Sequence, residues 1–503
     1  MWEITGNGLK KPSYLFGTMH VSSKLAFHLS DSFYYAIRKV DAVALELNPE
    51  LWQGQMVDMN KLNEAYTGYV MPSGSEYVNE KSFRIQPYEE MLKLGMRTEP
   101  PVVNSLLYRS YKAREDFEED TFLDLYIYQT GRKLGKAPAG VEDYYASEKL
   151  VLEAYADMAK EKKKKEIDLD GETMSGMVEK MQQAYRRGDL DLMDSIDIML
   201  EKSPAFREKF LYKRNEIQAD AIDSIMHTRS LFVGVGAAHL PGDRGVIELL
   251  RKKGYTLRPV NMHDRDALQR DQVDKLHVPV VFQTQYANDS IYKVDVPGPL
   301  YTINNQSELS RWQYADMNNG SYYMVTRVKT YAGFFGSNAQ EVLRKTDSLL
   351  YENIPGRIVT KKNIMVDGYP AIELTNRTRR GDLQRYRMIA TPYEMIIFKM
   401  SGKDEYANGP EAERFFSSIK MQPGNSHTQP FVPAQGGFAI DMPAAVHQFY
   451  NPLQERWEYE SSDPQTGDAY LVMKRSTHND GFIEADSFDL ALAAESFHNT
   501  ELF

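Results

Sequence analysis

The sequence predicts an α/β N-terminal domain, formed mainly by a parallel sheet with helices and a helical insertion, followed by α+β repeats with antiparallel sheets. Apolar runs that end in Gly-x-x-His stand at 14–20 and 231–239, and helical patterns separate the runs between them. Short apolar runs of this kind are typical of buried parallel strands. After about residue 265 apolar and polar residues alternate, which indicates antiparallel strands with one buried face.

Length and composition exclude several classes of protein. A chain of 503 residues exceeds one ordinary core, so we expect two to four domains. The chain is 42% hydrophobic and 26% charged, as in globular proteins, and we recognise no membrane-spanning run and no signal peptide. A net charge of −11 argues against nucleic-acid binding. Because cysteine is absent, disulfides, thiolate nucleophiles and cysteine-based zinc sites are excluded.

The first sixty residues alternate strand and helix signals. Tyr14–Gly17 is a short apolar strand, and a helix with Ser30 or Asp31 as its N-cap continues to Val40. Ala42–Leu47 is the next apolar run. Apolar runs separated by helices indicate a parallel sheet that is covered on both faces.

The rest of the first domain is expected to be rich in helix. Residues 61–134 and 146–227 have helical patterns, and between them residues 135–142 predict a short strand that ends at Glu142. Three further elements complete the domain: a helix at Arg214–Met226, a helix at Gly245–Lys253 stopped by Gly254, and a strand at Thr256–Val260.

The second half of the chain contains an internal repeat. Tyr292–Pro297 recurs as Phe438–Pro443, and Arg311–Tyr314 recurs as Arg456–Tyr459, at offsets that agree to one residue. The second copy stops at Phe503, about half way through the length of the first, so we expect this chain to be a fragment of a longer protein.

Alternating patterns and breaks define the elements of this half and the expected domains. Strands are predicted at 322–328, 364–374 and 385–389, with a hairpin turn at Asp367-Gly368, and helices at 339–351 and 410–419. The expected domains are a catalytic domain (1–265), a connector (266–282), repeat 1 (283–422), a linker (423–436) and a truncated repeat 2 (437–503).

Four strand ends in the first domain carry side chains that can bind a metal. They are His20, Glu46, Glu142 and His239. In open α/β sheets, sites form beyond the carboxyl ends of the parallel strands. Two imidazoles and a carboxylate form a common catalytic metal set, in which the metal activates water and a second carboxylate acts as a base. A lone Gly-x-x-His is more often structural, but two of them with two glutamates favour a site.

Other signals have a structural explanation beside a functional one. Arg214-Asn215 begins the helix before the second histidine strand; it can be a surface arginine and a helix cap, or a clamp for a carboxylate or oxyanion. His28, His227 and His263 have no comparable setting and are interpreted as surface or structural residues. The chain has no His-Glu-x-x-His and no Gly-x-Ser-x-Gly, so thermolysin-type and serine-hydrolase sites are not indicated.

Residues 2–262 resemble the TraB/GumN family, the bacterial relatives of the TIKI metalloproteases. The order and spacing of several motifs carry this resemblance: Trp2-Glu3-Ile4, Gly6, Gly8, Tyr14–His20, Leu45-Glu46-Leu47, Gly140-Val141-Glu142, Gly188-Asp189-Leu190, Arg214-Asn215, Val235–Gly242, Gly245-Val246 and Gly254-Tyr255. The pattern of the C-terminal repeats resembles the PsbP-like α+β fold, which implies no activity.

The resemblance implies an α/β fold and a divalent-metal-dependent peptidase with Mn, Co or Zn as its metal. By position it places His20, Glu46 and His239 at the metal, with Glu142, Arg214 and Asn215 in support. Glu142 would act as general base or support, and Arg214 would hold the substrate, a peptide or protein.

Two alternatives to a metal-dependent hydrolase remain open. The same histidines could hold haem or another metal compound without turnover, or the chain could be an envelope scaffold that uses its repeats for interaction. Since the family is usually exported, we expect a periplasmic or cell-envelope location.

Overall fold

The computed structural model contains two compact units, each discontinuous in sequence. It describes residues 1–19, 29–67, 88–97, 121–161, 173–200, 203–261, 267–305, 309–332, 336–379, 381–422, 428–443, 446–451, 456–463, 466–475, 491 and 495. The first unit consists of Met1–Met56, Pro101–Pro279 and Ala315–Gly320, and the second of Val57–Pro100, Val280–Tyr314 and Ser321–Phe503. Each unit has its own sheet and its own hydrophobic core.

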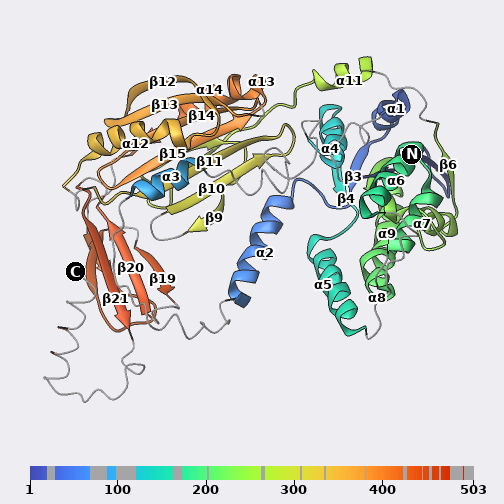
Figure 1. Cartoon of the computed structure of the whole chain (residues 1–503), viewed down its shortest axis with the longest axis horizontal. Coiled ribbons are helices and arrows are strands. Elements are labelled where there is room, and N and C mark those ends of the chain that lie inside the picture. Colours follow the sequence, from blue (N-terminus) through green and yellow to red (C-terminus); the bar gives the residue numbers. More distant parts are fainter. Residues whose placement is uncertain are drawn as a thin grey trace. The chain divides into compact units, whose positions relative to one another are not determined.

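A six-stranded mixed sheet forms the centre of the first unit (Figure 1). Its order is β4-β3-β5-β2-β1-β6; the first four strands run parallel, and β1 and β6 add an antiparallel edge. The expectation of a mainly parallel sheet is confirmed. The strands are β1 (Trp2–Gly6), β2 (Ser13–Thr18), β3 (Ala42–Leu45), β4 (Ala137–Gly140), β5 (Leu231–Gly236) and β6 (Tyr255–Pro259).

Helices cover both faces of this sheet, because successive strand residues point to opposite sides. On one face Leu15 and Val233 share a core with Ile222 of α9 and Leu250 of α10. On the other face the ring of Phe33 from α1 packs edge-on against Phe232 of β5. The helices are α1 (Asp31–Lys39), α4 (Leu123–Lys133), α5 (Tyr144–Lys160), α6 (Met174–Arg187), α7 (Leu190–Leu200), α8 (Pro204–Arg207), α9 (Arg214–Met226), α10 (Val246–Lys252) and α11 (Ala267–Asp274), with a π-helical turn at Glu208–Lys213 and a 3₁₀ turn at Ala237–His239.

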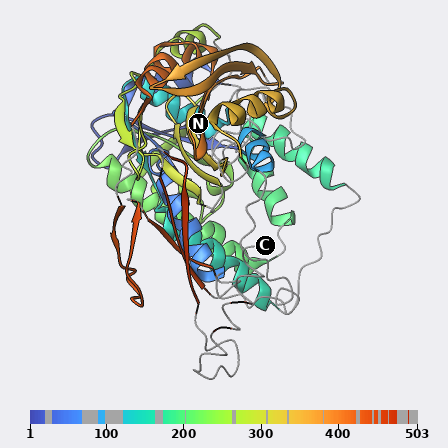
Figure 2. The ribbon, with the colours of Figure 1, turned by 90° about the vertical axis from the view of Figure 1, so that its left-hand side faces the viewer.

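A seven-stranded sheet of order β12-β13-β14-β15-β11-β10-β9 organises the second unit (Figures 1 and 2). Phe415 of α14 packs on one face with Phe398, and α3 and α12 pack on the other. Its strands are β9 (Tyr301–Asn305), β10 (Leu309–Asp316), β11 (Ser321–Lys329), β12 (Arg357–Val366), β13 (Tyr369–Arg377), β14 (Leu383–Ala390) and β15 (Glu394–Gly402), and the helices are α3 (Glu89–Arg97), α12 (Ala339–Asn353), α13 (Asp404–Ala407) and α14 (Pro410–Ser418). Helix α2 (Trp52–Thr67) crosses the limit between the two units.

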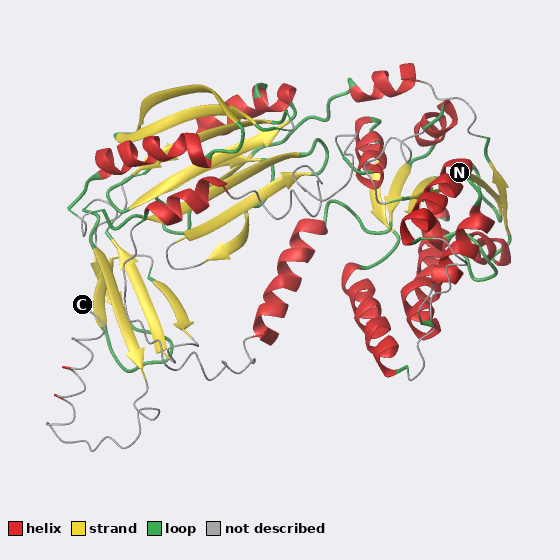
Figure 3. Ribbon diagram, in the orientation of Figure 1, coloured by secondary structure: helices red, strands yellow, loops and turns green. Residues whose placement is uncertain are grey.

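The internal repeat corresponds to two runs of four strands in the same order. Strands are drawn in yellow in Figure 3. The first copy contains β8 (Tyr292–Val296) and then β9, β10 and β11; the second contains β18 (Ile440–Pro443), β19 (His447–Asn451), β20 (Arg456–Ser462) and β21 (Ala469–Arg475). In each copy the last three strands are neighbours in one sheet. Three short strands complete the unit: β7 (Gln283–Tyr286), β16 (Lys420–Met421) and β17 (Thr428–Phe431).

Most expected elements appear with limits shifted by one to three residues. The Asp367-Gly368 hairpin is confirmed, since both residues have positive φ between β12 and β13. The strand expected to reach Leu47 ends at Leu45, and the one expected to reach Glu142 ends at Gly140. The boundaries expected at 265, 282, 422 and 436 stay predictions.

Some expectations fall on residues that the structure does not describe. These are His20, His28, His263 and, within the helical pattern expected over 61–134, residues 68–87 and 98–120. Among the described residues, no helix is both long and apolar enough to span a bilayer.

Candidate metal centre

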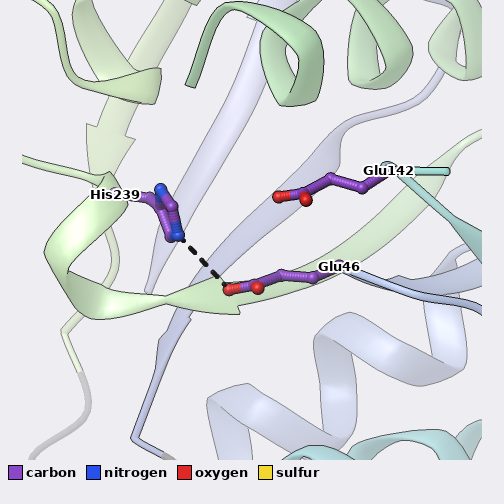
Figure 4. A group of neighbouring side chains, drawn as sticks. All are labelled: Glu46, Glu142 and His239. Atoms are coloured by element: carbon purple, nitrogen blue, oxygen red, sulfur yellow. Dashed lines mark ion pairs between the residues drawn. The ribbon is translucent and has the colours of Figure 1, made fainter. Parts of the chain in front are cut away.

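Three side chains that the sequence pointed to meet at the carboxyl edge of the parallel strands (Figure 4). Glu46 is the residue after β3, Glu142 follows β4 by two residues, and His239 closes the 3₁₀ turn after β5. These strands are neighbours in the order β4-β3-β5, so their carboxyl ends lie along one edge. One potential ligand atom from each side chain lies within 4.8 Å of the other two.

The main chain fixes the two glutamates relative to each other. The N–H of Glu142 donates to the carbonyl of Glu46 at 2.8 Å, and the N–H of Val141 donates to Leu45 at 3.0 Å. The β3–β4 pairing thus continues past the ends of both strands. Two carboxylates are therefore held side by side by backbone bonds, and their side chains reach the same space.

Gly236, the last residue of β5, brings the histidine segment close to Glu46. Its N–H donates to Oε1 of Glu46 at 2.6 Å. A Cβ at this position would lie 3.1 Å from that same oxygen and 3.4 Å from Cδ2 of His239. A glycine here lets the backbone N–H donate to the carboxylate without crowding the imidazole.

Arg214, the first residue of α9, lies between the two carboxylates. Its Nε donates to Oε2 of Glu142 and its Nη2 to Oε2 of Glu46, each at 2.9 Å. Burial by itself would lower the pKa of Arg214, but attraction to Glu142 and Glu46 and the hydrogen bonds to them raise it. The guanidinium therefore stays charged and balances part of the negative charge of the site.

Asn215 orients the imidazole of His239. Its Nδ2 donates to the carbonyl of Arg244 at 2.8 Å, and its Oδ1 lies 2.6 Å from Nδ1 of His239. Since Oδ1 can only accept, Nδ1 of the neutral ring carries the proton. Nε2 is then the unprotonated nitrogen, and it lies 3.6 Å from Oε1 of Glu46.

Two residues that sequence reasoning missed complete the surroundings of Glu142. Gln218 of α9 donates through Nε2 to Oε1 of Glu142 at 2.5 Å, and Ser147 of α5 donates through its hydroxyl to Oε2. Gln218 stands one helical turn after Arg214, and Ser147 stands in the first turn of the helix that follows Glu142. Helical spacing from Arg214 could have pointed to Gln218; no signal in the sequence singles out Ser147.

The two Gly-x-x-His motifs lie side by side as far as the structure describes them. Gly17 pairs with Val235 in the parallel β2–β5 ladder. A Cβ on Gly17 would lie 2.8 Å from a methyl group of Leu240 and 3.2 Å from Cβ of Ala237. The first glycine thus makes room for the segment that carries His239, while His20 itself lies outside the described residues.

The donor set fits a divalent metal ion. Two carboxylates and an imidazole nitrogen suit Mn²⁺, Co²⁺ or Zn²⁺. Ligand atoms about 2.1 Å from a tetrahedral metal lie about 3.4 Å apart, close to the separation of Nε2 of His239 and Oε1 of Glu46. An unprotonated nitrogen and a carboxylate oxygen at this distance favour a cation between them. Glu46, Glu142 and His239 therefore form a candidate metal-ligand group.

Comparisons with known proteins add a family to this geometry. The model of the TraB/PrgY/gumN family matches residues 1–259, a range that contains every side chain of the candidate centre. No curated protein matches the chain.

Solved structures that resemble the chain do so only in part. A protein from Bacteroides thetaiotaomicron shares 8% identity over 30% of this chain and 53% of its own length, with a TM-score of 0.19, so this chain spans about half of it. A protein of unknown function from Pseudomonas aeruginosa shares 12% sequence identity over 26% of this chain and 90% of its own length, with a TM-score of 0.18. LpqN of Mycobacterium tuberculosis, involved in cell envelope biogenesis, shares 14% sequence identity over 28% of this chain and 91% of its own length, with a TM-score of 0.20. These low scores carry no functional assignment.

Proposed function

The chain belongs to the TraB/PrgY/gumN family, and on that premise we propose that it is a divalent-metal-dependent hydrolase that cleaves peptides. The observation that carries the proposal is the meeting of Glu46, Glu142 and His239 at adjoining strand ends. Buried carboxylates and imidazoles are stable only when they are paired with hydrogen-bonding or charged partners. Packing alone therefore does not explain why three potential metal ligands lie at one edge of a sheet.

The residues of the centre would have different roles. Glu46 and His239 would hold the ion, together with His20 as the sequence predicts, and Glu142 would bind through one oxygen or accept a proton from water. A divalent ion bound here supplies a Lewis acid that polarises a carbonyl and lowers the pKa of water. In the neutral imidazole of His239, the hydrogen bond of Nδ1 to Asn215 leaves Nε2 available to the ion. Arg214 bridges the two carboxylates through Nε and Nη2 and so fixes their relative position.

For Arg214 the geometry favours this supporting role over the substrate clamp expected from the sequence. Its Nε and Nη2 donate to the glutamates, and its Nη1 donates to the carbonyl of Phe210 at 3.4 Å. Only 12% of its side chain is exposed. A guanidinium engaged in this way is poorly placed to receive a substrate carboxylate.

Metal content and peptide cleavage test the proposal. Purified protein should contain a divalent metal by elemental analysis, and it should cleave members of a peptide library until a chelator is added. The His20→Ala/His239→Ala double variant should lose at least about 100-fold in metal affinity, because even partners of metal ligands are worth 10- to 100-fold. His227→Ala is the matched control, since this exposed histidine ends α9 away from the three glutamate and histidine ligands.

Two results would contradict the proposal. The metal assignment is wrong if the double variant binds metal and cleaves peptides as the parent does. A haem spectrum on titration, without peptide cleavage, would instead support the non-catalytic alternative. The envelope location is a separate proposal, which cell fractionation tests.

A further inference from the structure

Gln218 is buried beside the candidate metal centre and contacts one of its ligands. It lies on α9, its side chain is fully buried, and its Nε2 donates to Oε1 of Glu142 at 2.5 Å. We propose that Gln218 is a positioning residue that orients Oε1 of Glu142, so that this oxygen offers the metal a single position. This inference rests on the proposed metal-dependent function and adds to it the way in which one ligand is held.

Only the nitrogen of the Gln218 amide is hydrogen-bonded, which argues against a purely structural role. Its Oε1 is buried and has no hydrogen-bond partner among the described residues. Turning the amide over would point this oxygen at the carboxylate of Glu142, so that two acceptors would face each other. A buried amide oxygen without a partner destabilises the fold. The hydrogen bond from Nε2 to Glu142 is the interaction that offsets this cost.

The consequence for Glu142 follows from counting donors. An ionised carboxylate has about four positions that accept hydrogen bonds or metal ions. Arg214 and Ser147 occupy two of these on Oε2, and Gln218 occupies one on Oε1. About one position then remains, on the oxygen that Gln218 holds, so Glu142 can offer a single lone pair to an ion.

One helix thereby orients all three candidate ligands. Arg214 contacts Glu46 and Glu142, Asn215 contacts His239, and Gln218 contacts Glu142 one turn later. Residues four apart share a helix face, which explains how Arg214 and Gln218 reach the same carboxylate. Because the three side chains share one backbone, they hold the ligands at fixed separations.

A second buried glutamine in the same unit shows what a structural role looks like. Gln53 donates through Nε2 to the carbonyl of Ala315 at 2.6 Å and accepts from the N–H of Ala315 at 2.6 Å. Both ends of its amide are satisfied by the main chain, and it contacts no candidate ligand. Gln53→Met is therefore the matched control for Gln218→Met.

Cobalt binding tests the proposal without relying on catalysis. The parent, Gln218→Met, Gln218→Asn and Gln53→Met would be titrated with Co²⁺ and followed by visible absorption, whose bands report coordination. Both Gln218 variants should bind Co²⁺ about 10- to 100-fold more weakly, and their bands should change as Oε1 of Glu142 loses the hydrogen bond that orients it. Asn keeps the amide but is too short to reach, so both variants should behave alike. Gln53→Met should melt earlier and keep the parent's affinity and bands.

The outcomes separate this inference from the proposed function. Parent-like affinity and bands in both Gln218 variants would overturn the positioning role. A parent that binds no Co²⁺ would overturn the metal centre and this role together. A parent that binds Co²⁺ but cleaves no peptide would contradict the hydrolase alone, and weaker binding by the Gln218 variants would still support the positioning role.

Discussion

Each compact unit contains an arginine between two carboxylates, in very different surroundings. In the first unit Arg214 bonds Glu46 and Glu142; in the second, Arg327 of β11 bonds Glu394 of β15 through two nitrogens and also bonds Asp289 at 2.5 Å. In both, burial opposes the charge of the arginine, but attraction to its carboxylates raises its pKa.

What differs is the position in the sheet. Arg327 and Glu394 lie on two strands that pair within the antiparallel sheet, and Asp289 lies in the loop before β8. Glu46 and Glu142 instead follow the ends of parallel strands, where His239 joins them. Within the described residues, the second group has no place among the candidate metal ligands. A similar set of charges thus forms a structural ion pair within the sheet of the second unit and a candidate metal centre at the strand ends of the first.

The largest effect should come from Arg327→Met. It would leave Glu394, whose side chain is only 2% exposed, without its counter-charge. Since breaking a buried pair destabilises by 3–5 kcal/mol, we expect the free energy of unfolding of the second unit to fall by about 4 kcal/mol in urea denaturation. Co²⁺ should not reverse this loss. Arg377→Met, which removes an exposed pair with Asp404, should change this free energy much less, because solvent screens the pair.

Arg214→Met should have a somewhat smaller effect that depends on metal. Without metal, Glu46 and Glu142 would repel each other, and we expect about 3 kcal/mol of destabilisation. A divalent ion would supply the missing positive charge, so Co²⁺ should raise the melting temperature of Arg214→Met more than that of the parent. Equal shifts in the two proteins would show that the carboxylates do not share a cation site, and the contrast with Arg327 would fail.

The smallest effect is expected from Asp41→Asn, at the opposite end of the same strands. Asp41 precedes β3, and hydrogen bonds from Ser230 and then Lys11 lower its pKa from 3.8 to about 2. A carboxyl with a lowered pKa stabilises the fold above its unfolded pKa, near 4, and loses this contribution as the pH falls towards 2.

Melting temperatures between pH 2 and 6 provide the measurement for this change. The parent should be slightly more stable than Asp41→Asn above pH 4 and equal to it near pH 2, while Co²⁺ affinity stays the same. A gap that persists at pH 2, or weaker Co²⁺ binding, would mean that the amino ends of β3 and β5 also influence the centre.

The sequence predicted the ligands of the candidate centre better than their surroundings. Glu46 and His239 were found because each follows an apolar run, and side chains at the ends of parallel strands share an edge. Gln218 and Ser147 escaped notice because they act through a carboxylate that is distant along the chain. Such partners depend on how α5 and α9 pack beside the sheet.

The sequence by itself determined the family, the alternation of strands and helices, and the repeat, since these depend on local periodicity and spacing. Only the tertiary structure decided that Arg214 pairs with both glutamates and that Asn215 sets the tautomer of His239. It also showed that both compact units are discontinuous in sequence, with Ala315–Gly320 in the first and Val57–Pro100 in the second. The physical reason is that hydrogen bonds and ion pairs between distant residues form only when the packing of sheet and helices brings donor and acceptor within about 3 Å.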